Sequence, residues 1–142
     1  MIILDTSIVS ETVKPKCNEV VLDWLSSQIP EHLFFTSIGL AEIYVGLGLL
    51  PPGKRKTNLT QELWEVIEEL FEQRLLPFDA DSAINYANIM INSKKTGRPI
   101  SIFDAQMAAI AKCHGFAVAT RDTKPFADIG LTVINPWNQA IS

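Results

Sequence analysis

Four scattered acidic residues occupy positions where a carboxylate needs a chemical or structural reason: Asp5, Glu42, Asp104 and Asp122. If they converge, their like charges raise one another's pKa values, and they cannot all ionise without compensation. A divalent cation such as Mg²⁺ or Mn²⁺ prefers oxygen ligands and removes this conflict. One or two such ions can activate water and stabilise a leaving oxygen in phosphodiester hydrolysis. The acids therefore indicate a metal-dependent hydrolytic site, although no compact metal-binding motif accompanies them.

Two of these acids follow predicted strands. Asp5 comes directly after the apolar run 1–4, and Asp122 follows the predicted strand 116–120. In an open parallel sheet, ligands bind beyond the carboxyl ends of the strands, so we expect both acids at one edge of the sheet. Each acid also has a structural alternative. Asp5 can cap the helix that follows it, and Asp122 can stabilise a turn.

The other two acids are expected on helices. Glu42 lies in the predicted helix 37–50, which is apolar nearly all round and is therefore expected to be buried in the core or at a subunit interface. A buried carboxylate is costly unless it is paired, protonated or bound to a cation, so Glu42 is either in an ion pair or a metal ligand. Asp104 forms a capping-box pattern with Ser101 before the predicted helix 101–114, and capping alone could account for it.

Strands and helices alternate along the chain. Short apolar runs predict strands, and amphipathic segments predict helices. The predicted strands cover residues 1–4, 33–36, 76–78, 116–120 and 131–134, the last at an edge of the sheet. A turn is predicted at residues 5–7, and a short helix after it ends near residues 14–15. The other predicted helices cover residues 19–28, 37–50, 60–75, 79–96 and 101–114. This order predicts one α/β domain over residues 1–142, with helices covering a mostly parallel sheet.

Composition and charge limit the function classes. The chain has 47% hydrophobic and 20% charged residues, which is typical of a globular domain. Its net charge of −4 argues against a sequence-independent nucleic-acid binder, but five glutamates within residues 62–72 supply that excess. No signal peptide or membrane span is apparent, and the two cysteines form no CxxC pair. We therefore expect a soluble cytoplasmic protein with free thiols and no membrane association.

The ordered set of motifs resembles the PIN domain of VapC-type toxins, including the FitB-like branch. The resemblance covers nearly the whole chain and is carried by residues 2–7, Glu42 in its apolar helix, and residues 97–106, 119–122 and 134–137. It implies a Rossmann-like, three-layer α/β/α sandwich with a mostly parallel central sheet. It also implies an endoribonuclease that depends on Mg²⁺ or Mn²⁺. Asp5, Glu42, Asp104 and Asp122 would coordinate the metal, and the hydroxyls of Thr6 and Thr120 would support the site.

The same resemblance implies a prokaryotic toxin that cuts RNA, forms homodimers and assembles with a small DNA-binding antitoxin of the VapB type. One departure concerns Pro125, which stands where many relatives carry an acid just before the Phe. Asp122 is therefore the only candidate in this segment for the fourth acid of the site, and a second metal site has less support. Arg98, Arg121 and Lys124 are candidates for contacts with substrate phosphates, or are simply surface charges.

Two other function classes match parts of the pattern. The main alternative is a non-catalytic PIN protein that acts as the partner of a DNA-binding transcription regulator, and the four intact acids argue against it. A phosphoryl-transfer switch or phosphatase on a doubly wound sheet is disfavoured. An aspartyl phosphatase would need a second Asp where Ser7 stands, and a receiver domain would need paired acids before its phospho-acceptor.

Overall fold

The computed structural model describes residues 1–138, which are built around a five-stranded parallel sheet. Its strands are β1 (Ile2–Leu4), β2 (Leu33–Thr36), β3 (Leu75–Leu76), β4 (Ala117–Ala119) and β5 (Val133–Ile134). The order β3-β2-β1-β4-β5 makes β1 central and β5 an edge strand, and every pairing is parallel. The predicted α/β class is confirmed. The single domain predicted over 1–142 extends to residues 139–142, which lie outside the described part of the chain.

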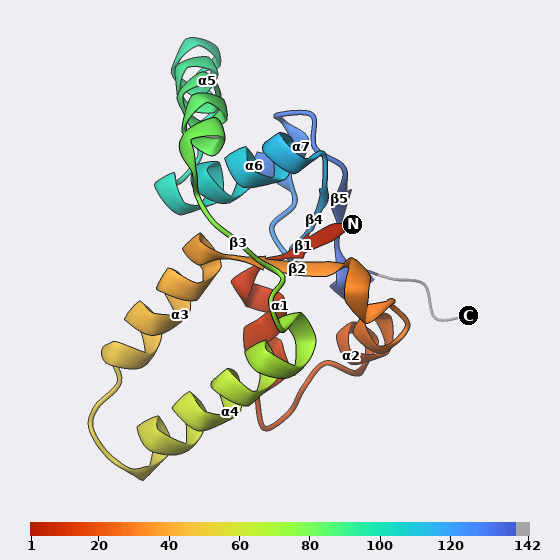
Figure 1. The fold of residues 1–142 in the computed structure, drawn as a ribbon, viewed down its shortest axis with the longest axis vertical. Coiled ribbons are helices and arrows are strands. Elements are labelled where there is room, and N and C mark those ends of the chain that lie inside the picture. The colour runs from red at the N-terminus through yellow and green to blue at the C-terminus, as the bar shows by residue number, and fades with distance from the viewer. Residues whose placement is uncertain (139–142) are drawn as a thin grey trace.

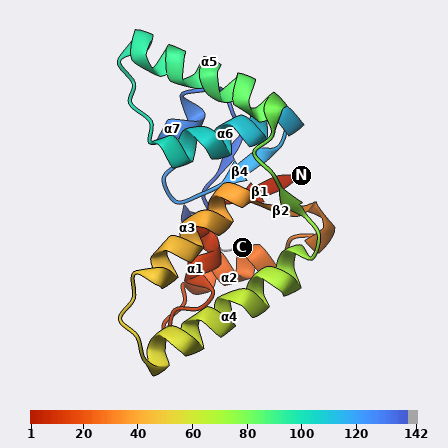
Figure 2. The same cartoon turned by 60° about the vertical axis from the view of Figure 1, so that its left-hand side comes forward.

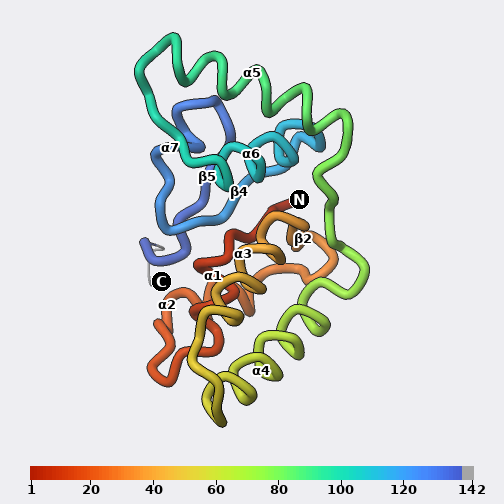
Figure 3. The backbone as a smooth tube through the Cα atoms, turned by 90° about the vertical axis from the view of Figure 1, so that its left-hand side faces the viewer, coloured from red at the N-terminus to blue at the C-terminus, as the bar shows by residue number. Residues whose placement is uncertain are grey.

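Helices cover both faces of the sheet (Figures 1 and 2). One layer contains α1 (Thr6–Glu11), α2 (Glu19–Ser26), α3 (Ser37–Gly48) and α4 (Lys54–Phe71). The other contains α5 (Ala80–Thr96), α6 (Ile102–His114) and α7 (Lys124–Ala127), and two 3-10 helices complete the fold, η1 (Pro30–His32) and η2 (Pro136–Asn138). Figure 3 follows the chain from α4 past the sheet to α5. This arrangement confirms the predicted α/β/α sandwich. No helix within residues 1–138 has both the length and the apolarity needed to cross a bilayer.

Alternate residues of β1 supply the two halves of the core. Ile3 packs in the cluster with α5, α6 and α7, whereas Leu4 packs in the cluster with α1 to α4. Successive side chains of a strand point to opposite faces, so a strand covered on both sides is apolar throughout. Both residues are fully buried. The apolar run before Asp5 thus fixes the strand whose end carries this acid.

The largest boundary error concerns α4, which was predicted over 60–75 and is observed over Lys54–Phe71. Its first turns are mostly exposed and leave no apolar pattern to read. The helix ends before 75 because Glu72 adopts a φ of 45°, in the left-handed region. The Arg74 side chain then donates a hydrogen bond to the carbonyl of Leu70 and satisfies the end of the helix.

Two helices near the candidate site begin with side-chain caps, and one of them begins earlier than predicted. Residues 6–7, expected in a turn, form the first turn of α1, which Asp5 caps. Thr36, rather than Ser37, caps α3 by accepting a hydrogen bond from the Gly39 amide at 3.0 Å. Side-chain oxygens at these positions satisfy free N–H groups of the first helical turn. Both helices therefore start directly at a strand end, without a connecting loop.

Helix α3 is buried along one face only, so the core of this chain does not bury it throughout, and burial of its other face at a subunit interface stays a prediction. Ile43 and Leu47 are buried, whereas Tyr44, Val45 and Leu49 are 50%, 56% and 81% exposed. The buried face packs on the cluster formed with α1, α2 and α4. The high apolar content of this helix therefore reflects a core contact on one side and an open apolar face on the other.

Of the three glycines of α3, only Gly39 lies in close contact with a neighbouring element. A Cβ at Gly39 would lie 2.7 Å from the Phe35 ring, whereas at Gly46 or Gly48 it would meet no described atom within 4 Å. The Phe35 ring is fully buried and stacks on a second buried ring, with 5.0 Å between centroids, so it has little room to move. Gly39 therefore lets α3 approach β2 closely, just before the turn that carries Glu42.

Candidate active site

Asp5 lies at the carboxyl end of the central strand and is held by hydrogen bonds. Its carboxylate accepts from the Thr6 amide at 2.8 Å and the Thr6 hydroxyl at 3.4 Å. It also accepts from the Ser7 hydroxyl at 2.9 Å and the Thr120 hydroxyl at 2.8 Å. Bonds of this kind fix the orientation of the carboxylate. The capping role expected as an alternative is thus present. Ser7 was not predicted as a supporting residue, although its spacing from Asp5 suits such a bond.

Thr120 connects Asp5 to Asp122. Strands β1 and β4 are neighbours, with Leu4 opposite Ala119, so the segments that follow them meet at one edge. Thr120 is 1% exposed; its hydroxyl donates to Asp5 and accepts from the Asp122 amide at 3.3 Å. The chain bends at Arg121, and Asp122 is exposed. The structure therefore brings both strand-end acids to the predicted edge of the sheet.

Glu42 is half-buried and lines a groove between α1, α3 and α4, together with Thr6, Ser10 and apolar side chains. Among residues 1–138 its carboxylate has neither an ion-pair nor a hydrogen-bond partner, so the expected alternative of an ion pair is not found. Burial raises the pKa of Glu42 from 4.5 to about 7, and the charges of Asp5 and Asp104 add to the increase. The surrounding protein therefore does not balance the charge that Glu42 carries when it is ionised.

Asp104 lies in the first turn of α6, where its amide forms one of the two hydrogen bonds of the expected capping box. The Ser101 hydroxyl caps the helix by accepting from the Asp104 amide at 3.1 Å. Burial nevertheless raises the pKa of Asp104; a hydrogen bond with Ser101 opposes this shift, and the charges of Asp5 and Asp122 reinforce it. Capping therefore does not remove Asp104 from the electrostatic influence of the other acids.

The four acids interact electrostatically without forming a preassembled metal cage. Within residues 1–138, no group of three or more His, Cys, Asp or Glu side chains is arranged to hold a metal ion. Even so, Glu42 responds to Asp5 and Asp104, and Asp104 responds to Asp5 and Asp122. Mg²⁺ usually keeps several waters and uses only one or two carboxylates, so an open set of oxygen donors suits it. The donor chemistry therefore fits Mg²⁺ or Mn²⁺, whose charge would relieve the mutual repulsion.

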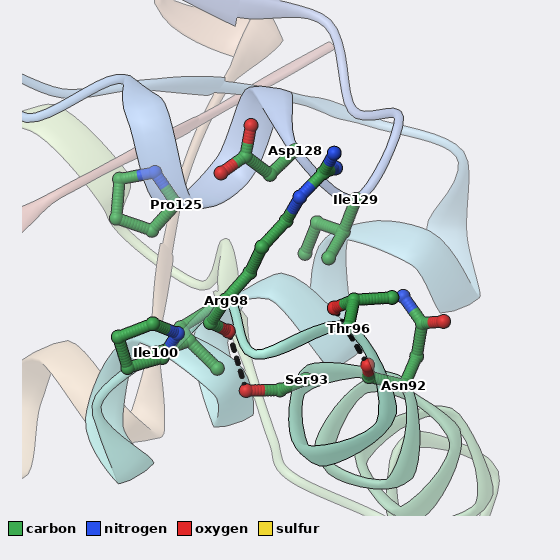
Figure 4. Close-up of a pocket in the computed structure, with 9 residues that line it drawn as sticks. Asn92, Ser93, Thr96, Arg98, Ile100, Pro125, Asp128 and Ile129 are labelled. Carbon is green, nitrogen blue, oxygen red and sulfur yellow. Dashed lines mark hydrogen bonds between the residues drawn. The ribbon is translucent and has the colours of Figure 1, made fainter.

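The three basic residues expected near a substrate have different surroundings. Lys124 forms an ion pair with Asp128, with 2.8 Å between Nζ and Oδ2. The Arg121 guanidinium lies 5.2 Å from the centre of the Trp137 ring, in cation–π geometry. Arg98 lines a small cavity with Asp128 (Figure 4). Sequence reasoning missed Asp128, although a Lys and an Asp four residues apart on a helix are a recognisable signal.

Comparison with known families places this architecture. Residues 2–131 match the PIN domain. The chain belongs to the PIN-domain family. This PIN domain is 42% identical to the VapC ribonuclease Y4jK of Sinorhizobium fredii over 140 residues, which cover 99% of this chain and 100% of the relative. It is 43% identical to the toxin FitB of Neisseria gonorrhoeae over 138 residues, which cover 97% and 99% of the two chains.

Solved structures agree with these sequence relatives. The PIN domain aligns with a chain of the FitAcB crystal structure from Neisseria gonorrhoeae at a TM-score of 0.91 and 42% identity, covering 98% of this chain and 100% of that one. A structure of FitAB bound to an IR36 DNA fragment aligns with a TM-score of 0.91 and 41% identity, covering 99% of both chains. The predicted resemblance to the VapC-type PIN domains, including the FitB-like branch, is confirmed.

Proposed function

We propose that this PIN domain is a divalent-metal-dependent endoribonuclease and the toxin of a toxin–antitoxin pair. The observation that carries the proposal is the electrostatic grouping of Asp5, Glu42, Asp104 and Asp122, in which Glu42 has no partner among the described residues. Full-length relatives support it, because one is named a VapC ribonuclease and another a toxin, at 42% and 43% identity.

The four acids would hold the ion, and each would contribute differently. A bound Mg²⁺ or Mn²⁺ supplies positive charge that activates water and stabilises the leaving oxygen of the phosphodiester. Asp5 offers a carboxylate already oriented by its hydrogen bonds. Glu42 and Asp104 have raised pKa values, so they must lose their protons to bind a cation. Asp122 adds a carboxylate at the edge of the sheet.

The proposed partners are an RNA substrate, a small DNA-binding antitoxin of the VapB type and a second copy of the chain. The structure of FitAB bound to a DNA fragment, in which one chain aligns with nearly all of this one, supports the antitoxin assembly. Ile84 and Ile91, on α5, are 65% and 52% exposed and would suit a homodimer contact. The molar mass of the purified chain, with and without a co-expressed antitoxin, would test both assemblies.

The decisive experiment is an RNA-cleavage assay on purified, partner-free protein. We expect cleavage of structured RNAs with added Mg²⁺ or Mn²⁺, none with EDTA, and strongly reduced cleavage by Asp5→Asn. Asp81→Asn is the matched control, because Asp81 is an exposed acid in the first turn of α5. If the wild-type protein cuts no RNA with either ion, and Asp5→Asn leaves its effect on cells unchanged, the enzyme proposal is wrong.

A further inference from the structure

The loop before α6 and the short helix α7 meet at a small cavity that none of the four acids lines. The loop contributes Arg98 and leads to Asp104, whereas α7 contributes Asp128 and begins two residues after Asp122. The end of α5 closes the cavity with Thr96 (Figure 4). This junction therefore joins the segments that carry two of the four acids.

Asp128 interacts with two cations at this junction. Lys124 Nζ lies 2.8 Å from Asp128 Oδ2, and the two side chains are 80% and 29% exposed. Figure 4 shows the Arg98 side chain extended from the loop toward the segment of Asp128 and Ile129. The pKa of Asp128 is lowered first by its hydrogen bond with Lys124, then by the charges of Lys124 and Arg98. Within residues 1–138 Arg98 forms no ion pair within 4.0 Å, so its guanidinium keeps its donors for another ligand.

We propose that Asp128 takes the place of a substrate phosphate at Lys124 and Arg98, and that the RNA backbone displaces it when it binds. This inference rests on the proposed ribonuclease function and deepens it by naming residues that control backbone binding on the segments leading to Asp104 and following Asp122. Lys and Arg are the side chains that neutralise RNA phosphates. Asp128 therefore sets how readily these cations bind RNA.

The geometry favours a phosphate that displaces the Asp128 carboxylate at the surface over one that enters the cavity. The cavity has a volume of about 20 Å³, enough for about one water molecule, so a phosphate must contact the cations from outside. Lys124 is largely exposed, and an exposed pair four residues apart on a helix is weak, so a phosphate can replace the carboxylate. Losing the Asp128 charge should therefore strengthen RNA binding. The exposed ion pair contributes little to the fold, and its carboxylate no longer competes with RNA phosphates for the two cations.

The test is RNA binding in metal-free buffer, measured by fluorescence anisotropy with a labelled RNA hairpin and the full chain. Asp128→Asn should lower the Kd by about threefold or more and steepen the dependence of log K on log salt by up to about one unit. Arg98→Ala with Lys124→Ala should raise the Kd. In that double variant, Asp128→Asn should have no further effect, because the two cations with which Asp128 interacts are gone.

Asp81→Asn is the matched control, since it removes the same charge from the other end of α5. With a rise of about 1.5 Å per residue, Asp81 lies about 20 Å along the helix from Thr96, beyond the Debye length of about 8 Å. The inference is overturned if Asp128→Asn fails to tighten binding, if Asp81→Asn tightens it equally, or if the gain persists without the two cations. These outcomes leave metal-dependent cleavage by the wild type intact, whereas absence of that cleavage would defeat the proposed function itself.

Discussion

Asp5 and Glu42 belong to the same candidate site, yet Asp5 accepts hydrogen bonds from three residues whereas Glu42 accepts none from the described chain. The strand half of the site, which contains Asp5 and Asp122, is ordered by the sheet and by the Thr120 hydroxyl between them. The helix half, Glu42 and Asp104, carries raised pKa values instead. The difference indicates that the protein itself orients one half of the site, whereas a cation must stabilise the charge of the other.

The largest expected effect is on catalysis, where the two halves should be equally necessary. Asp5→Asn and Glu42→Gln should each lower the RNA-cleavage rate strongly. Removing a residue that only supports a metal ligand typically costs about 10–100-fold, and these two losses should be larger. Their effects on the metal-free fold should differ, because Asn loses charge-assisted bonds whereas Gln removes an unbalanced charge. Cleavage kinetics and thermal unfolding in EDTA would show both effects. A Glu42→Gln variant that retains near-normal cleavage would remove the helix half from the site.

The Thr120 hydroxyl tests how far the strand half depends on its hydrogen bonds. Thr120→Val removes the 2.8 Å bond to Asp5 and the 3.3 Å bond from the Asp122 amide. We expect metal affinity to fall by about 10–100-fold, with part of the rate restored at high metal concentration. Titration of activity with Mn²⁺ would measure this. Thr132→Val, at an exposed position before β5, is the control, and an equal loss there would refute a specific role for Thr120.

Gly39 tests whether the helix half depends on the close approach of α3 to β2. Gly39→Ala places a Cβ 2.7 Å from the buried Phe35 ring and should cost about 1–3 kcal/mol of unfolding free energy. Gly46→Ala is the matched control on the same helix, because its Cβ would meet no described atom within 4 Å. It should instead stabilise the fold by up to about 1 kcal/mol. Urea unfolding would compare the pair, and opposite signs are expected.

The smallest effect concerns pH. The pKa of Glu42 is raised from 4.5 to about 7 in the folded protein, so the folded state retains a proton that the unfolded chain loses. Stability of the metal-free protein should therefore fall as pH rises from 4.5 to about 7 and then level off. We expect a change of about 1 kcal/mol, because solvent screens a half-exposed carboxylate. Thermal unfolding in EDTA would show a flatter profile for Glu42→Gln. An unchanged slope in that variant would assign the effect elsewhere.

Much of the fold was predictable because it depends on local patterns. The apolar run before Asp5 predicted a strand, and the strand-end rule placed Asp5 and Asp122 at one edge of the sheet. Exposed segments gave no such pattern, so the start of α4 was misplaced. Thr36 caps α3 although the hydroxyl oxygen of Ser37 is also able to accept such a bond, because the backbone angles decide between the two residues.

The sequence by itself determined which residues could do chemistry and which elements carry them, because hydrophobic period, capping and strand ends are properties of neighbouring residues. Only the tertiary structure decided that Glu42 lacks a partner, that Thr120 joins Asp5 to Asp122, and that Asp128 lies near Arg98 as well as Lys124. The bond between Thr120 and Asp5 and the approach of Arg98 to Asp128 join residues far apart in the chain. They depend on β1 lying between β2 and β4 and on how closely the helices pack, which no local pattern specifies.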